Sequence, residues 1–417
     1  MKSPSLHIAT DPNKQKQSCR KIKIGLFLDA LPFTGGTFQY NQTILEAVAA
    51  LPPDRYDVVA GYTSKLWIEQ LKGHQVKSIS IRYGFVSRVF GILLNLLHLP
   101  ISICHKISPL FQSTVRTLLR ERCDLWIFPS QDVLSYQAPV PSLVTILDLA
   151  HRYEKRFAES ASKSEYLIRE RTFSNICRWA KGILVQTEPG RQQVVDAYCM
   201  PTEEIHILPL TPPAYIHAKG VPPGFDSRYK LPVKYLFYPA QFWEHKNHRN
   251  LLLAIASLKN ELPDLKLVLA GSKKNAYDAV VSMVQDLNLG EDVLFLGYVP
   301  DEDMPELYRR ARALIMPTYF GPSNIPPLEA GVVGCPVAIS NISSMPEQLG
   351  DSAIIFDPDS VSEIAACIRR LWTDDRLCAQ LTEAGKQQMA KWGQKEFNAR
   401  LEEIISQVVG NQPEQRP

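Results

Sequence analysis

The chain has 417 residues, and at about 100–200 residues per domain this length predicts two or three domains. Its 45% hydrophobic and 21% charged residues are typical of a globular protein and exclude a mainly disordered, collagenous or fibrous chain. Because 46 lysines and arginines nearly balance 43 aspartates and glutamates, the net charge of +3 argues against nucleic-acid backbone binding as the main function.

The chain opens with a polar tail, residues 1–20, which lacks the apolar core of a secretory signal and which we expect to be disordered. Short β-type runs then alternate with helical stretches, the pattern of β-α-β units. The expected strands of this half are Ile22–Asp29, Tyr56–Tyr62, Val76–Ile81, Leu125–Pro129, Leu143–Asp148, Ile183–Gln186 and Ile205–Leu208. The expected helices include Phe38–Leu51, Glu165–Ala180 and Gly190–Tyr198.

One long apolar segment, Val86–Ile103, is interrupted by charged and polar residues and by Pro100. It falls short of the roughly 20 uninterrupted apolar residues that a membrane-spanning helix needs. Two interpretations remain open, an amphipathic helix lying on a membrane surface and a helix covered by its own domain. On the first interpretation, Leu94 and Leu97 are expected to face the lipid.

A proline-rich segment follows the first half. Residues 209–232 contain six prolines and two glycines, which favours a linker over a helix or a central strand. Beyond it the alternation restarts, with expected strands at Tyr235–Pro239, Leu265–Ala270, Val293–Gly297, Ala313–Met316, Val337–Ser340 and Ala353–Phe356. The expected helices are His248–Leu262, Tyr277–Leu289, Glu302–Arg312, Val361–Thr373, Arg376–Trp392 and Phe397–Val409.

The strand candidates are continuously apolar rather than alternating, which is typical of parallel strands buried on both faces. We therefore predict an α/β protein with two doubly wound, Rossmann-like domains that face each other across a cleft. The predicted boundaries are 21–210 for the first domain, 211–232 for the linker, 233–392 for the second domain and 393–410 for a terminal helix.

In open α/β sheets ligands bind at the carboxyl ends of the strands, so the loops after the strands are the candidate sites. Gly35 and Gly36 follow the first strand and precede a helix, where backbone amides can approach an anion; an ordinary flexible turn is the alternative. Lys246 follows the first strand of the second domain and can meet a diphosphate, although most lysines are solvated surface residues.

Two further loops carry candidate residues. The loop before Ile325 leads into a helix whose N-terminus can face a phosphate, and Glu329 lies close to the same place. A carboxylate at a helix start is equally well explained as a partner of the helix dipole. In the first domain, Asp148 and His151 follow a strand and are catalytic candidates; a structural role for His151 is equally open.

We expect no metal site. The triplet Asp301-Glu302-Asp303 has the DxD spelling of metal-dependent sugar transferases, but it directly precedes a helix, so we interpret its carboxylates as helix caps. The nine histidines show no HExxH motif. The eight cysteines show no CxxC pair, and we expect reduced thiols in a cytoplasmic protein.

Several of these motifs occur together in one known family. The segments "GPSNIPPLEA" and "QFWEHKN", the early "GG" and the pair Pro346-Glu347 resemble family 4 of the retaining GT-B-fold glycosyltransferases, the glycosyl transferases group 1. The resemblance extends from about Ile22 to the terminal helices. It implies that the last helix, Phe397–Val409, crosses back onto the first domain.

The resemblance also implies roles for individual residues. Lys246 matches the lysine that contacts the donor diphosphate, and Glu329 matches the glutamate that holds the nucleotide ribose. The other donor-site positions that it implies are Gly35, Gly36, Gln241, Tyr298, Val299, Ser323, Asn324 and Ile325. Lys246, Asp148 and His151 are the catalytic candidates.

This sequence departs from the family pattern at three positions. Gln241 stands where an arginine is common, Gly321 stands where the first glutamate of a pair is usual, and Leu147 replaces a frequent histidine before Asp148. The joint loss of a cation and an anion suggests a coordinated rearrangement of the donor site.

The function implied is sugar transfer with retention, from a UDP- or GDP-linked donor to a glycan or lipid-linked hydroxyl, without a metal or other cofactor. The resemblance is to a subgroup associated with bacterial surface polysaccharides, so a hexosyl group such as mannose is expected. The chain is expected to be cytoplasmic, with peripheral contact to the inner face of the membrane left open. The alternatives are a nucleotide-sugar-binding protein that has lost turnover and a transferase acting on small molecules.

Overall fold

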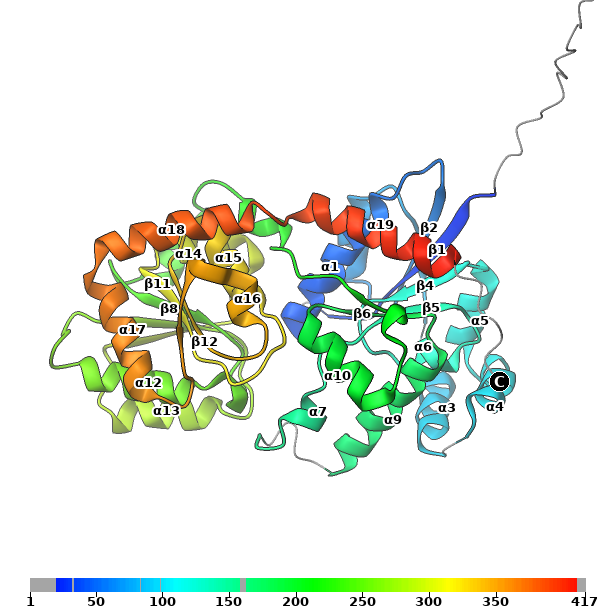
Figure 1. Cartoon of the computed structure of the whole chain (residues 1–417), viewed down its shortest axis with the longest axis horizontal. Helices are drawn as coiled ribbons and strands as arrows, with labels where there is room; N and C mark the ends of the chain where they lie inside the picture. The colour runs from blue at the N-terminus through cyan, green and yellow to red at the C-terminus, as the bar shows by residue number, and fades with distance from the viewer. Residues whose placement is uncertain (1–19, 32–33, 83, 98, 158–162, 411–417) are drawn as a thin grey trace, which may run out of the picture.

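The computed structural model describes residues 20–410 except 32–33, 83, 98 and 158–162. The polar tail and residues 411–417 therefore lie outside the described residues, apart from Arg20. Two α/β units lie side by side, the N-terminal one on the right of Figure 1 and the C-terminal one on the left. Each is built on a parallel sheet, which confirms the predicted fold class.

The N-terminal sheet has seven strands in the order β3-β2-β1-β4-β5-β6-β7, and the pairings given for the described residues are all parallel. Its strands are β1 (Ile22–Leu28), β2 (Tyr56–Tyr62), β3 (Lys77–Ser80), β4 (Leu125–Phe128), β5 (Ser142–Thr145), β6 (Gly182–Val185) and β7 (Ile205–Ile207). Its helices are α1 (Gly36–Ala49), α2 (Trp67–Lys72), α3 (Phe85–Leu96), α4 (Ile101–Phe111), α5 (Ser113–Glu121), α6 (Leu134–Gln137), α7 (Ala150–Tyr153), α9 (Lys163–Trp179) and α10 (Glu188–Tyr198), followed by the short 3₁₀ helix η2 (Thr202–Glu204).

The C-terminal sheet has six strands in the order β10-β9-β8-β11-β12-β13. They are β8 (Leu236–Pro239), β9 (Leu267–Ala270), β10 (Val293–Gly297), β11 (Ala313–Met316), β12 (Val337–Ser340) and β13 (Ala353–Phe356). The helical elements are η4 (Glu244–Lys246), α12 (His248–Leu258), α13 (Tyr277–Asp286), η5 (Asp301–Asp303), α14 (Met304–Arg310), α15 (Ile325–Val333), α16 (Met345–Leu349), η6 (Gly350–Ser352), α17 (Val361–Thr373) and α18 (Asp375–Met389).

Buried apolar strands form the centre of both units. Strands β4, β5 and β6 and strands β8, β9, β11 and β12 are buried along almost their whole length, because helices cover both faces of each sheet. The expected strands are all present, and their ends agree with the structure to within two residues except at Leu143–Asp148. There β5 ends at Thr145, and Asp148 instead accepts the backbone N–H of Ala150 at the start of α7.

The terminal helix α19 (Gln394–Gly410) belongs spatially to the N-terminal unit. Helices α18 and α19 run along the same side of both units (Figure 1), and α19 packs on α1. Its apolar face, which includes Phe397, Leu401 and Ile404, is completely buried in the N-terminal core. The chain thus crosses between the units twice, near residues 209–232 and again after Met389.

Two segments differ from the expected organisation. Residues 209–232 are more than a linker, because they form the short helices η3 (Ala214–His217) and α11 (Phe225–Tyr229), whose Ile216 and Phe225 join the C-terminal core. The apolar segment Val86–Ile103 forms parts of two helices, α3 and α4, because Pro100 starts a new helix. Within the described residues, no helix combines the length and hydropathy needed to cross a membrane.

The strand orders locate the ligand site. In each sheet the order reverses between two central strands, β1 and β4 in the first and β8 and β11 in the second. Ligands of open α/β sheets bind at the carboxyl ends of the strands at such a reversal. The loops that follow β1, β8 and β11 carry the Gly35-Gly36 pair, Lys246 and Asn324, so the topology brings these residues to one place.

Candidate functional site

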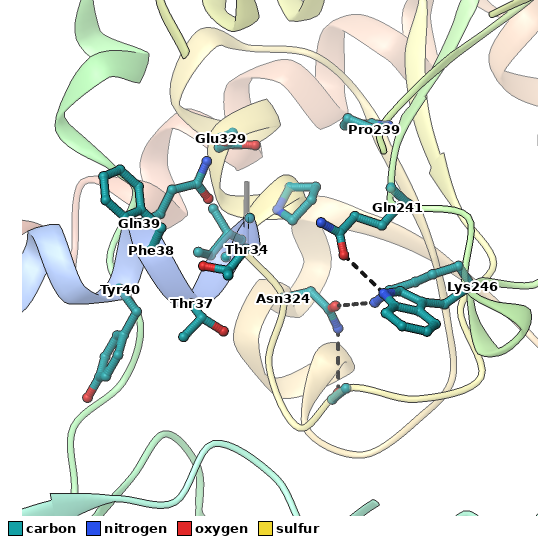
Figure 2. Close-up of a pocket in the computed structure, with 18 of the residues that line it drawn as sticks. Thr34, Thr37, Phe38, Gln39, Tyr40, Pro239, Gln241, Lys246, Asn324 and Glu329 are labelled. Atoms are coloured by element: carbon teal, nitrogen blue, oxygen red, sulfur yellow. Dashed lines mark hydrogen bonds between the residues drawn. The ribbon is translucent and has the colours of Figure 1, made fainter. Parts of the chain in front are cut away.

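A cavity of about 630 Å³ lies between the two units at these carboxyl ends. The residues predicted from the sequence that line it are Gly35, Gly36, Asp148, Gln241, Lys246, Tyr298, Val299, Ser323, Asn324, Ile325 and Glu329. Figure 2 shows side chains from α1 on one side of this cavity and Gln241, Lys246 and Asn324 on the other. Within the described residues, His151 is the one predicted site residue that does not line it.

Two helix N-termini point into the cavity from opposite sides. Helix α1 begins at Gly36 after Gly35, whose φ of 64° is a backbone conformation that favours glycine. Helix α15 begins at Ile325, and a Cβ atom placed on Gly36 would lie only 3.5 Å from the Ile325 Cδ1 atom. Since helix N-termini carry partial positive charge, the two helices together favour an anion at this point.

Lys246 adds a full positive charge to the same region. It is the last residue of η4, in the loop that follows β8, and its Nζ donates a hydrogen bond to Asn324 Oδ1 at 3.4 Å (Figure 2). Burial lowers the pKa of Lys246 to about 8, and the nearby Asp148 carboxylate only partly opposes this effect. An anionic ligand beside Nζ would stabilise the charged form, so the site is suited to a phosphate or diphosphate.

The position of Lys246 follows from its neighbour Asn247. Asn247 adopts a left-handed φ of 57°, and its side-chain amide donates to the carbonyl oxygens of Pro317 and Pro358, both at 2.9 Å. Its Oδ1 accepts the backbone N–H of Asn250 and caps α12. This polar anchor ends the turn of η4 and holds the lysine backbone at the end of the strand.

The Asn324 side chain fills the space that a side chain at position 321 would need. Gly321 has a φ of 140°, and a Cβ atom at this position would lie 2.6 Å from Asn324 Nδ2. A larger residue at 321 is therefore incompatible with the present position of Asn324. This contact gives a physical account of one departure from the family pattern: the side chain missing at 321 leaves room for the amide that accepts from Lys246.

The second departure, Gln241, lies where the two units approach each other. Its Oε1 accepts a hydrogen bond from Trp243 Nε1 at 3.0 Å, and its Nε2 lies 3.5 Å from a Cβ atom placed on Gly35. The Trp243 ring also contacts Lys274, whose Nζ lies 5.0 Å from the ring centre. A neutral amide and an aromatic ring therefore form this part of the cavity wall.

Glu329 is almost completely buried and is held by two tyrosines. Its carboxylate accepts hydrogen bonds from the hydroxyl of Tyr308, at 2.5 Å, and from the hydroxyl of Tyr215. Burial raises the pKa of Glu329 to about 7, while the two tyrosine hydrogen bonds oppose that increase. Glu329 therefore titrates near neutral pH, in a place where hydroxyl groups are already its partners.

Tyr215 is a site residue that sequence reasoning missed, because it lies in η3 within the segment expected to be only a linker. Its hydroxyl also accepts a hydrogen bond from Gln39 Nε2 of α1, at 2.7 Å. The chain Gln39–Tyr215–Glu329 therefore connects the N-terminal unit, the connecting segment and the C-terminal unit. In the sequence, Tyr215 stands out only as a tyrosine in a proline-rich segment. That feature does not predict where its side chain points.

The two catalytic candidates of the first domain, Asp148 and His151, lie in different surroundings. Asp148 lines the cavity, and its Oδ1 accepts from the Arg169 guanidinium at 2.7 Å. His151 is buried against α9, with its Nε2 3.2 Å from the Glu170 carboxylate and its ring edge-on to Phe173. Burial lowers its pKa. The expectation that His151 faces the cleft is therefore wrong, because its position in the first turn of α7 places the ring against α9 in the core.

The acidic triplet lies at a helix start, as expected, and Asp303 is the N-cap residue of α14, but its side chain makes no capping hydrogen bond. Asp303 is 1% exposed, and its carboxylate accepts from the Arg228 guanidinium at 2.7 Å and from the Tyr229 hydroxyl at 2.6 Å. It therefore fixes α11 to the C-terminal unit. Asp301 lines the cavity, and burial raises its pKa while a hydrogen bond with Gln39 opposes this. Among the described residues there is no cluster of three histidine, cysteine or acidic side chains suited to a metal ion.

The C-terminal domain that carries most of this site is similar in sequence to known glycosyltransferases. Residues 226–388 match the family model of glycosyl transferases group 1. The O-antigen chain mannosyltransferase B of Escherichia coli is 32% identical over 207 residues, which are 47% of this chain and 52% of that protein. A serotype-specific mannosyltransferase of Escherichia coli is 27% identical over 172 residues, 40% of this chain and 21% of that protein. The chain thus spans about half or less of the length of these relatives.

Solved structures extend the comparison to the first domain. The crystal structure of Anabaena HepE in complex with UDP superposes with a TM-score of 0.69 at 16% identity, covering 92% of this chain and 100% of that one. This likeness shows a shared two-domain fold. Residues 226–388 of the present chain are thus similar to the glycosyl transferases group 1 family, and the chain as a whole shares the two-domain GT-B fold of solved glycosyltransferases.

Proposed function

We propose that this protein is a retaining glycosyltransferase that moves a sugar from a nucleotide sugar to a hydroxyl group. The observation that carries the proposal is the convergence of Lys246 with the N-termini of α1 and α15 in one cavity between the domains. Bond cleavage at the sugar places growing negative charge on the departing nucleoside diphosphate. Preorganised positive groups at that point stabilise the transition state more than the ground state.

The other lining residues suit the remaining parts of such a donor. In this proposal Glu329 accepts from the ribose hydroxyls, and Tyr298 and Val299 lie beside the base. The loop Ser323–Ile325 surrounds the phosphates and sugar, and Gly36 approaches from the other domain. Retention of configuration is inferred from the family resemblance. Asp148 is the carboxylate of the N-terminal domain on the acceptor side of the cavity.

The acceptor and the sugar are inferred from the relatives. Because two relatives are named as mannosyltransferases, one of them for O-antigen, we propose a mannosyl donor and a glycan or lipid-linked acceptor of a surface polysaccharide. The direct test is release of nucleoside diphosphate from GDP-mannose, with UDP-glucose as the comparison, in the presence of mannose-containing acceptors. Product analysis by NMR spectroscopy then reports whether the anomeric configuration is retained. No release from any donor in a nucleotide-sugar panel would refute the proposal.

A second candidate is a protein that binds nucleotide sugars without transferring them. Gly321 supplies no carboxylate, and both oxygens of Glu329 already have tyrosine partners, which favour this alternative. A ligand that binds only the folded state raises the melting temperature in either case. Stabilisation by a donor without release of nucleoside diphosphate, across a panel of acceptors, distinguishes this alternative from an enzyme.

We expect turnover to be independent of a divalent metal. In the proposed site, the charge on the diphosphate is met by Lys246 and the two helix N-termini, so no cation is required for that task. Activity measured with excess chelator should equal activity in untreated buffer. Complete loss of nucleoside diphosphate release in chelator, restored by Mg²⁺ or Mn²⁺, would show that Asp301 at the cavity wall serves a metal.

Replacing Tyr215 with phenylalanine should lower the donor KM several-fold. Tyr215 donates to one oxygen of Glu329, so its hydroxyl competes with a ribose hydroxyl for that oxygen. The ring is retained in the variant, and only the competing hydroxyl is lost. Isothermal titration with the nucleoside diphosphate checks the effect, and Tyr229→Phe, whose hydroxyl binds Asp303 outside the cavity, is the matched control. Weaker binding in Tyr215→Phe would mean that this hydroxyl itself contacts the nucleotide.

A further inference from the structure

Helices α3 and α4 carry their apolar side chains on the outside. Phe85 is 82% exposed, and large apolar residues follow it along both helices. The exposed members, here called the α3–α4 patch, are Phe85, Val86, Val89, Ile92, Leu93, Leu97, Ile103, Leu110 and Phe111. The two helices lie at the outer end of the N-terminal domain, away from the C-terminal domain (Figure 1). Soluble proteins rarely expose a contiguous apolar surface of this kind unless it binds something.

The inner face of the same helices is small and partly polar. Ser87 is buried and its hydroxyl lies 3.0 Å from that of Ser113, while the carbonyl of Gly91 accepts a hydrogen bond from Gln137 Nε2 at 3.0 Å. In α4 the buried positions are Cys104 and Ser108. Hydrogen bonds and close packing thus hold the helices on the domain, and this attachment directs their apolar side chains outward.

Leu94 shows that the packing, and not the apolar character alone, decides which residues face out. It is 2% exposed, whereas Leu97 is 59% exposed. The expectation that both leucines face a lipid surface is therefore wrong for Leu94, which lies on the buried face of α3. A test of the patch has to use its exposed members.

The segment of chain that carries the patch is basic. Between residues 81 and 120 the sequence contains no aspartate or glutamate, and it contains five basic residues, Arg82, Arg88, Lys106, Arg116 and Arg120. Arg82, Lys106, Arg116 and Arg120 are exposed. The whole chain has a net charge of only +3, so this segment is distinctly more basic than the rest. Apolar side chains bordered by cations match an anionic membrane surface, where acyl chains lie behind negatively charged headgroups.

We propose that the α3–α4 patch docks the protein on the surface of a bilayer that contains anionic lipids. Phe85, Ile92 and Leu93 would enter the interface between headgroups and acyl chains, and the basic residues would remain at headgroup level. The helices lie along the surface, since each is far shorter than a spanning helix. This docking does not depend on the proposed transfer reaction.

Co-sedimentation of the full chain with vesicles, without any donor, tests the proposal. The protein should bind vesicles of phosphatidylethanolamine and phosphatidylglycerol, and bind phosphatidylcholine vesicles much more weakly. The triple variant Phe85→Glu/Ile92→Glu/Leu93→Glu should lower the partition coefficient at least about tenfold, because each lost apolar insertion weakens binding. Lys106→Glu should lower it severalfold on anionic vesicles only, and more at low salt than at high salt.

Val233→Glu is the matched control, since Val233 is a fully exposed apolar residue of the C-terminal half; it should bind like the unmodified protein. Unchanged melting temperatures show that the variants fold. Equal sedimentation of the triple variant, or no binding to anionic vesicles, would overturn the proposal. So would light scattering that shows a dimer which the triple variant dissociates, because the patch would then be covered by a second copy.

Discussion

Replacing Lys246 with alanine should lower kcat by roughly 10²–10³, which is the loss found when one preorganised transition-state donor is removed. The effect on donor binding should be smaller, because the charge on the diphosphate grows as the glycosidic bond breaks. Steady-state kinetics of nucleoside diphosphate release separate the two quantities. Lys274→Ala is the matched control, since Lys274 also lines the cavity but lies over the Trp243 ring.

The lowered pKa of Lys246 also predicts how kcat/KM depends on pH. In the free protein the lysine loses its proton as the pH rises through about 8, so kcat/KM for the donor should fall above that pH. Lys246→Arg keeps the charge at high pH and should shift this fall to higher pH, whatever its effect on the maximum rate. A Lys246→Ala variant with an unchanged kcat would remove Lys246 from the catalytic step.

Replacing Glu329 with glutamine should raise the donor KM by about tenfold to a hundredfold, the range for a lost hydrogen bond to a charged group, and leave kcat nearly unchanged. The proposed partner, the ribose, does not change charge in the reaction. Glu306→Gln is a suitable control because Glu306 pairs with Arg309 and Arg310 of its own helix. If the variant instead abolished kcat with donor affinity intact, Glu329 would be acting at the sugar, in place of the carboxylate that Gly321 does not supply.

The raised pKa of Glu329 predicts how the unmodified protein depends on pH. Below about pH 7 the carboxylate becomes protonated, so the donor KM should rise as the pH falls, and Glu329→Gln should abolish that dependence. The same group affects the stability of the fold in the opposite direction, since its contribution weakens as the pH rises. Because the pKa is higher in the folded state than in the unfolded state, this group makes folding less favourable as the pH rises from 4.5 to about 7. Urea unfolding across this range should show a flatter pH profile for the variant.

The strands and the positions of the site loops could be predicted from the sequence because they depend on local chemistry. Runs such as Leu125–Phe128 are short and apolar throughout, which in an alternating β-α pattern is typical of a strand buried on both faces. Given parallel sheets, the carboxyl ends of β8 and β11 share one edge, so the loops that carry Lys246 and Asn324 lie on the same side of the sheet.

The directions of individual side chains could not be predicted in this way. His151 and Asp148 are three residues apart, yet one enters the core against Glu170 while the other faces the cavity. Tyr215 reaches Glu329 although 114 residues separate them. These outcomes depend on contacts between distant segments, which carry no local sequence pattern.

The sequence by itself determined the two parallel-sheet domains, the loops that carry the site and the apolar character of α3 and α4, since periodicity, glycine and proline act over a few residues. Only the tertiary structure decided that Asp303 fixes α11, that Leu94 is buried while Phe85 is exposed, and that Glu329 is shared by two tyrosines. The physical reason is that a helix or loop has several faces of similar composition. Which face is buried is decided by the packing and hydrogen-bonding groups that the rest of the fold brings against it.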